Sequence, residues 1–193
     1  MTLNHPTLRA SLQKAYSAEK AAALAYIGHA ASLKDPKERT RVKEIEQDEW
    51  DHRNAVNELM QLYDIPVSKY YEFLYTFIGK SIGYSCYLIG RFMPYFFAGK
   101  LESGNVCEYI VMIRYFHEVG IKDHDAILYQ MGIKEKEHEV YFLETIKDAA
   151  WLPLFEKVFN WGNNQSQNDI ELEKLNPLKQ ATDYCHKTHP PKQ

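Results

Sequence analysis

The pattern Glu-x-x-His occurs twice in the chain, as EWDH at residues 49–52 and as EKEH at residues 135–138. Residues three apart on a helix share a face, so each motif lets a carboxylate and an imidazole reach one ligand from the same helix. One such motif is weak support for a site, because charged helices produce it by chance. The repetition indicates that two helices of this chain are built alike, and the rest of the sequence can be interpreted around them.

The first motif is preceded by a helix that carries a glutamate on its apolar face. Residues 8–33 are rich in Ala, Leu, Lys and Glu, and Glu19 falls on one face with apolar side chains by the three-four rule. Asp35 is a predicted N-cap with Pro36 at the first helical position. We expect the second helix to run from there to about Leu62, before the break at residues 65–66.

The second half of the chain repeats this order. A third helix is predicted from about residue 101 to 119 with Glu102 near its start, and Gly120 is a natural helix stop. Asp123 is the predicted N-cap of a fourth helix over residues 124–149, and residues 154–161 add a short one. Two helical hairpins joined by a long crossover are the ferritin-like arrangement. The sequence therefore predicts an all-α, ferritin-like four-helix bundle over residues 1–161.

The crossover, residues 67–97, is rich in Tyr, Phe, Ile and Leu, and it contains three glycines spaced for close helix packing, Gly79, Gly83 and Gly90. Lys80 and Arg91 interrupt its apolar runs, which leaves no stretch of about 18 apolar residues to span a membrane. Two interpretations stay open: a buried helical connection, or a surface that touches lipid or admits an apolar substrate. Residues 162–193 are polar, and we expect a flexible tail.

The amino-acid composition of the chain argues against several classes of function. The chain has 193 residues, 45% of them apolar and 25% charged, with a net charge of -3, so nucleic-acid binding has no electrostatic support. Its three cysteines are widely spaced and form no CxxC pair, which argues against thiolate metal sites and disulfides and favours a reducing compartment. With no signal-peptide pattern at the N-terminus, we expect a cytoplasmic protein, with peripheral membrane contact as the alternative.

The two motifs and the two preceding glutamates form one candidate ligand set. Four carboxylates in one core repel each other and cost several kcal/mol each unless cations neutralise them. One Glu from each of two helices plus Glu-x-x-His from the other two is the di-iron carboxylate pattern, and oxygen ligands with imidazole suit iron or manganese. The predicted ligands of two iron ions are Glu19, Glu49, His52, Glu102, Glu135 and His138.

Other polar residues near these positions leave alternatives open. Tyr26 and Tyr109 each follow a candidate ligand by seven residues. Two roles stay open for these tyrosines: a hydrogen bond to the ligand carboxylates, or ordinary packing in the core. Glu108 is the alternative to Glu102 as the ligand from the third helix. Tyr115 follows Glu108 by seven residues, and the midpoint between Glu108 and Glu135 lies near the turn at Gly120, as expected for two residues that face each other across a hairpin. The small residues at 103–105 favour Glu102.

The second half resembles the rubrerythrin motif in Glu102-Ser103, Tyr109, Gly120 and the EKEH at 135–138, and this match selects Glu102 over Glu108. The glycine-punctuated crossover instead resembles that of demethoxyubiquinone hydroxylase, a membrane-associated member of the same ferritin-like di-iron superfamily. The resemblance covers roughly residues 10–148. The hairpin between Glu102 and Glu135 is shorter than in the hydroxylase, and no rubredoxin-type cysteine module follows.

The resemblance implies dioxygen activation and hydroxylation of a quinone ring. We therefore expect a di-iron monooxygenase that acts on dioxygen and an apolar small molecule, with no catalytic residue beyond the metal ligands. A separate reductase would donate the electrons, since the sequence has no flavin or nicotinamide fingerprint. Ferroxidase or peroxidase activity and a non-enzymatic bundle are the alternatives, and a homodimer is left open.

Overall fold

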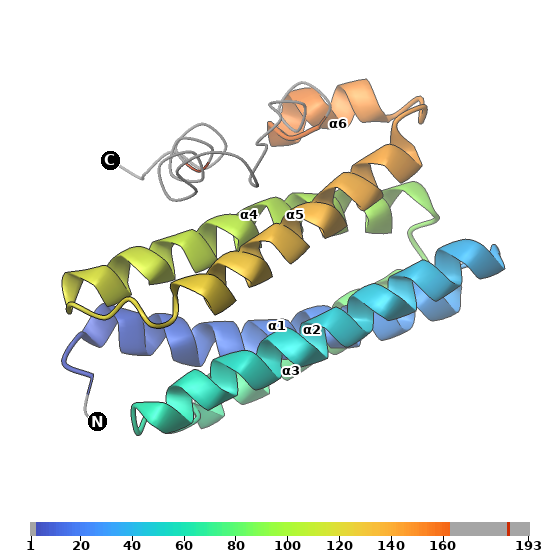
Figure 1. The fold of residues 1–193 in the computed structure, drawn as a ribbon. Coiled ribbons are helices and arrows are strands. Elements are labelled where there is room, and N and C mark those ends of the chain that lie inside the picture. Colours follow the sequence, from blue (N-terminus) through green and yellow to red (C-terminus); the bar gives the residue numbers. More distant parts are fainter. Residues whose placement is uncertain (1–2, 163–184, 186–193) are drawn as a thin grey trace. The chain divides into compact units, whose positions relative to one another are not determined.

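The computed structural model describes residues 3–162 and Cys185 (Figure 1). These residues form six helices and no strand, which confirms the all-α class. The chain divides into two compact units, Met1–Arg91 and Phe92–Gln193. The helices of the first unit are α1 (Pro6–Ser32), α2 (Pro36–Leu62) and α3 (Lys69–Ser85), and those of the second are α4 (Phe92–Glu118), α5 (Asp125–Ile146) and α6 (Leu152–Phe159).

In the first unit, α1 packs against both α2 and α3 (Figure 1). Both long helices start at side-chain caps. The Nδ1 atom of His5 accepts a hydrogen bond from the backbone N–H of Leu8 at 2.9 Å, and Asp35 accepts from the N–H groups of Lys37 and Glu38. The predicted start of the second helix at Asp35 and Pro36 is confirmed, because this cap satisfies N–H groups that have no partner within the helix.

Glycine allows α1 and α3 to approach at backbone distance. A Cβ atom added to Gly79 would lie 2.5 Å from the carbonyl oxygen of Ala21, and one added to Gly83 would lie 2.8 Å from that of Leu24. Only glycine fits contacts this short. The expected role in close packing is therefore confirmed for Gly79 and Gly83 but is wrong for Gly90, where an added Cβ atom would meet nothing within 4 Å.

The other side of α3 is open to solvent. Tyr70, Phe73 and Phe77 are 69%, 77% and 66% exposed, although a buried connection was one of the two expectations for this segment. Their spacing places them along one stripe of the helix. Among the described residues, no helix is both long and apolar enough to cross a bilayer.

In the second unit, α4 and α5 pack as a hairpin around a turn in which Gly120 adopts a φ of +77°. The expected start of the third helix near residue 101 is wrong, since α4 begins at Phe92. Its extra turns pack through aromatic rings, with the Phe96 ring 5.0 Å from that of Phe155 and 5.1 Å from that of Trp161. Packing against distant rings thus stabilises these turns as a helix, although their sequence predicted a connecting segment.

The start of α5 also differs from the prediction by one residue. The residue preceding the helix is His124 rather than Asp123, and its side chain makes no capping hydrogen bond. Instead, the His117 ring at the end of α4 lies 2.8 Å from Asp125 in the first turn of α5. The helix start is therefore fixed by a contact across the turn.

Two further contacts bind distant parts of the second unit together. Glu139 on α5 is almost fully buried, accepts a hydrogen bond from Trp161 Nε1 at 2.9 Å and pairs with Lys136 at 2.7 Å. A disulfide joins Cys107 on α4 to Cys185, contrary to the expectation that the cysteines form none. Residues 163–184 and 186–193, the bulk of the predicted flexible tail, lie outside the described residues.

We predict that Gly79→Ala lowers the free energy of unfolding by about 1–3 kcal/mol, because the new methyl group forces α1 and α3 apart. Gly132 on α5 is the matched control, since a Cβ there lies 3.7 Å from its nearest neighbour, the Val106 oxygen. Gly132→Ala should stabilise by about 0.4–1 kcal/mol through the unfolded chain. Chemical denaturation of both variants measures the difference, and equal effects would contradict the close-packing argument.

Candidate metal centre

The first unit brings together three of the predicted ligands. Glu19 comes from α1, and Glu49 and His52 come from successive turns of α2. Each offers one ligand atom, and these atoms lie within 4.8 Å of one another. All three side chains are buried, with exposed fractions of 4%, 0% and 7%. We call these three residues the first half-site.

The second unit contains an equivalent group. Glu102 comes from α4, Glu135 and His138 come from α5, and their ligand atoms also lie within 4.8 Å of one another. Exposed fractions are 1% or less, and His138 Nδ1 lies 3.9 Å from Glu135 Oε2. We call these residues the second half-site.

Helical spacing explains why these polar residues face inward. On α2, the buried stripe runs through Ile45, Glu49, His52 and Val56 at intervals of four, three and four residues. On α5, Glu135 and His138 occupy the same kind of stripe, which continues through apolar residues at both ends. Such a stripe normally carries apolar side chains, so a carboxylate and an imidazole within it require polar partners.

The chemistry of the donor set fits a divalent cation. Each half-site offers two carboxylates and one imidazole, and two buried carboxylates repel each other unless a positive charge lies between them. Oxygen ligands with one imidazole suit iron and manganese, whereas structural zinc sites in proteins are usually rich in thiolate. The buried Glu and His groups could therefore hold a metal ion.

The second half-site contains a contact that the sequence did not reveal. The side-chain amide nitrogen of Asn105 on α4 lies 2.9 Å from Glu102 Oε2 and 3.4 Å from Glu135 Oε2. At the sequence level Asn105 counted only as one of the small neighbours of Glu102. Its position one helical turn after Glu102 was the available signal, since residues at this spacing share a face.

The remaining candidate residues, and the buried His29 on α1, lie in different surroundings. Glu108 is exposed and belongs to neither half-site, whereas Glu102 is buried. Tyr26 and Tyr109 are both buried, and their hydrogen bonding to the carboxylates stays a prediction. His29 is outside both groups, and burial lowers the pKa of its ring to about 4, so it is neutral at pH 7.

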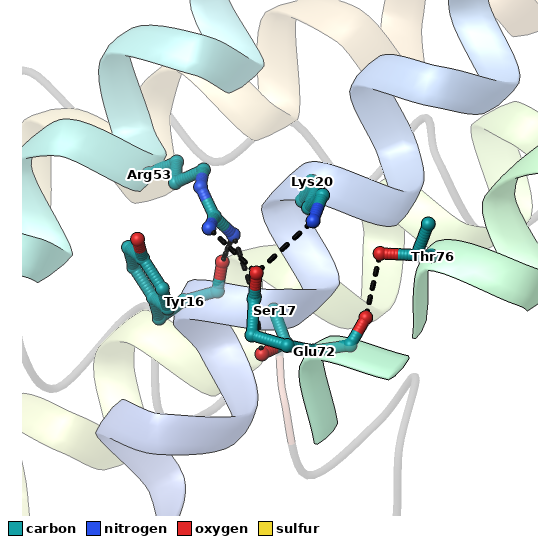
Figure 2. Close-up of polar contacts among 6 residues, drawn as sticks. All are labelled: Tyr16, Ser17, Lys20, Arg53, Glu72 and Thr76. Carbon is teal, nitrogen blue, oxygen red and sulfur yellow. Dashed lines mark hydrogen bonds and ion pairs between the residues drawn. The ribbon is translucent and has the colours of Figure 1, made fainter. Parts of the chain in front are cut away.

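A polar cluster fixes the helices that carry the first half-site (Figure 2). Glu72 on α3 accepts hydrogen bonds from Ser17 and Lys20 on α1 and from both terminal nitrogens of Arg53 on α2, at 2.8–3.0 Å. Arg53 also donates to the Tyr16 carbonyl, and its guanidinium stacks 3.6 Å above the Tyr16 ring. Because Ser17 lies two residues before Glu19 and Arg53 directly follows His52, this cluster fixes the position of α1 along α2 near the half-site.

No protein-family model, curated protein or solved structure matches this chain significantly. The family resemblance therefore rests on the residues of the chain, and the function has to be argued from the half-sites.

We predict that Glu72→Gln lowers the free energy of unfolding by about 1–2 kcal/mol at pH 7. Partial burial raises the pKa of Glu72, but hydrogen bonds from Arg53, Lys20 and Ser17 outweigh it and lower the pKa to about 2. Because the pKa of Glu72 is lower in the folded chain than in the unfolded chain, its ionised carboxylate stabilises the fold at pH values above the usual pKa of 4.5. This stabilisation is lost as the pH falls towards 2.

Urea denaturation of wild type and variant between pH 7 and pH 3, in the presence of chelator, measures this difference. The gap between the two should narrow below about pH 4.5. Glu44→Gln, in a surface pair with Arg41, is the control and should change stability by no more than about 0.5 kcal/mol. A gap that stayed constant with pH would rule out an ionised Glu72 as the source.

We predict that Glu102→Ala weakens metal binding at the second half-site by more than about 100-fold, because it removes a ligand rather than an outer partner. Glu108→Ala, on the exposed side of the same helix, should change the affinity by no more than about twofold. Equilibrium titration of metal-free protein with Fe(II) under anaerobic conditions measures both. The opposite ranking would make Glu108 the ligand.

Proposed function

We propose that this protein is a di-iron oxidoreductase that uses dioxygen to hydroxylate an apolar, quinone-like small molecule. One observation carries the proposal: each unit buries the same set of one Glu and one Glu-x-x-His, with ligand atoms within 4.8 Å. The proposal assigns one iron ion to each half-site, two for the chain. That the two ions form a single coupled centre is part of the proposal, and it rests on the six-ligand sequence pattern.

In this proposal, the residues of the protein bind the metal ions and exclude water from them. Glu19 and Glu102 each supply a carboxylate from one helix, and the two Glu-x-x-His motifs supply the remaining ligands. The apolar residues that flank the ligands on α2 and α5 exclude bulk water from the carboxylates. When bound, reduced iron supplies the redox chemistry that activates dioxygen.

The substrate class is inferred from the resemblance and from the surface of α3. The exposed aromatic side chains of Tyr70, Phe73 and Phe77 form an apolar surface. An apolar substrate, or a membrane in which such a substrate is dissolved, could contact this surface. The proposal requires a separate reductase, because the sequence has no binding fingerprint for a flavin or nicotinamide that would supply electrons.

The first experiment tests the metal centre. Metal-free full-length protein, reconstituted anaerobically with Fe(II), should bind about two iron ions per chain. After exposure to dioxygen, the ferric ions should be magnetically coupled, and EPR should show no signal from isolated high-spin ferric iron. His52→Ala should remove one iron, whereas His117→Ala, in the contact with Asp125, should leave the count unchanged. Two uncoupled irons would refute a dinuclear centre.

The second experiment tests the reaction. Iron-loaded protein is supplied with dioxygen, a chemical or enzymatic electron donor and a short-chain quinone, and products are followed by mass spectrometry. The proposal predicts a product heavier by one oxygen atom, labelled when ¹⁸O₂ is used. Fe(II) oxidation or peroxide consumption without any organic product would favour a ferroxidase or peroxidase. A folded protein that binds no iron would favour a non-enzymatic helical protein.

A further inference from the structure

A stripe of large side chains lies in solvent along the outer side of α3. Its members are three and four residues apart, and all but one are aromatic rings that are between 57% and 77% exposed. We call this set, which includes one exposed lysine, the α3 stripe: Tyr70, Phe73, Phe77, Lys80, Tyr84 and Tyr87. The other side of the helix, which carries Glu72, Gly79 and Gly83, packs on α1. The stripe is therefore the side of α3 that α1 leaves open.

The area of the stripe is large for a protein that exists as a monomer. An aromatic side chain buries about 150–250 Å² when it is fully enclosed, so the rings of the stripe present on the order of 600 Å². The largest apolar patch on a typical monomer is about 300–600 Å² and often has a function. Two such stripes enclosed against each other total about 1,200 Å², the low end for specific protein interfaces. The stripe is therefore large enough for a weak, specific contact.

The spacing of the stripe fits a second helix. Its intervals are 3, 4, 3, 4 and 3 residues, which gives the 3.5-residue period of a seam between two helices. These intervals are the same in both directions of the chain, so the stripe is symmetric about the point between Ile78 and Gly79. A helix with this symmetry matches a second copy of itself across a two-fold axis through that point.

We propose that the α3 stripe is the interface of a symmetric homodimer, in which α3 of one copy packs antiparallel against α3 of a second copy. Residues equally far from the midpoint then face each other across the interface, and each pair forms twice. The pairs are Tyr70 with Tyr87, Phe73 with Tyr84, and Phe77 with Lys80. Tyr87 contributes from the turn that directly follows α3, where its N–H donates to the Tyr84 carbonyl.

Lys80 determines the direction of the two helices. In the antiparallel arrangement its ammonium group faces the ring of Phe77, and a cation is attracted to the face of an aromatic ring. In a parallel pair, Lys80 would lie beside Lys80 of the other copy, and like charges repel. A shift of the antiparallel pair by one heptad leaves two positions of each stripe without a facing residue. The unshifted antiparallel pair is therefore the best match.

A lipid surface is the main alternative occupant of the stripe. A bilayer has no seam and no two-fold axis, so it requires neither the 3.5-residue period nor the symmetry of the stripe. A helix that lies on a membrane carries its lysines on the polar face, whereas Lys80 lies near the middle of the apolar stripe. A second copy of the chain accounts for both features.

This inference goes beyond the proposed function and does not rest on the metal centre, because no residue of the stripe belongs to a half-site. In the dimer the second copy covers Tyr70, Phe73 and Phe77. The substrate class of the proposed function would then rest on the family resemblance. Dimer formation and hydroxylation are therefore tested separately, and either can fail while the other stands.

Sedimentation equilibrium of metal-free full-length protein, from micromolar to submillimolar concentration, measures the association. Wild type should form a reversible dimer. Phe77→Glu places a negative charge at the centre of the interface and should weaken the dimer by more than about 30-fold. Tyr84→Glu, at a position that is equally exposed, is the second variant and should act in the same direction. Val158→Glu changes an apolar residue of α6 that is 63% exposed, and this control should leave the dimer unchanged.

Photo-crosslinking tests the direction of the helices. With p-benzoylphenylalanine in place of Phe73, the crosslink should form to the segment around Tyr84 of the second copy, as identified by mass spectrometry. Residues 73 of two antiparallel copies lie about 16 Å apart along the helix axis, so a crosslink between them would indicate a parallel pair. Lys80→Arg retains the cation and should dimerise as wild type does, whereas Lys80→Glu should weaken the dimer.

Three results would each refute this interface: a wild type that is monomeric over the whole range, a dimer that survives both Phe77→Glu and Tyr84→Glu, or a crosslink between the two residues 73. A monomer that sediments with vesicles of phosphatidylcholine and phosphatidylglycerol, and no longer does so as Phe77→Glu, would assign the stripe to a lipid surface instead. All of these measurements are made without iron, so none of them decides the metal centre.

Discussion

Burying two carboxylates within a few ångströms of each other is the constraint on which each unit of this protein depends. In both units a glutamate and a histidine interrupt the apolar stripe of one helix, and a second buried glutamate comes from the neighbouring helix. Without compensation, such groups cost several kcal/mol each, which is comparable with the whole stability of a domain. A bound divalent cation turns this cost into a favourable interaction. Metal binding and folding are therefore expected to be coupled in this chain.

The rest of each unit supplies the rigidity that such a site requires. Glycines let α3 lie against the backbone of α1, and the Glu72 cluster links all three helices of the first unit by hydrogen bonds. In the second unit, rings around Phe96 and the contact of Trp161 with Glu139 hold α6 against α4 and α5. Both arrangements lie outside the half-sites and determine which turn of one helix faces which turn of the next.

The sequence predicted much of this, for identifiable physical reasons. The Asp35 cap, the Gly120 turn and the spacing within Glu-x-x-His are local signals, so the long helices and the inward face of each motif could be inferred. The start of α4 at Phe92 could not, because it depends on ring packing with α6, which is distant in sequence. The disulfide between Cys107 and Cys185 joins residues 78 apart, and neither spacing nor composition indicated it.

Asn105 shows the limit of reasoning from a repeated motif. Repetition draws attention to what two halves share, here the glutamate, the tyrosine seven residues later and the Glu-x-x-His. The surroundings of the ligands depend equally on how the halves differ, because neighbouring hydrogen-bond donors orient carboxylates. In this chain the difference is an amide on α4 where α1 has a methyl group. The repeated residues thus define the candidate ligand set, and the contact of Asn105 had to be found from the structure.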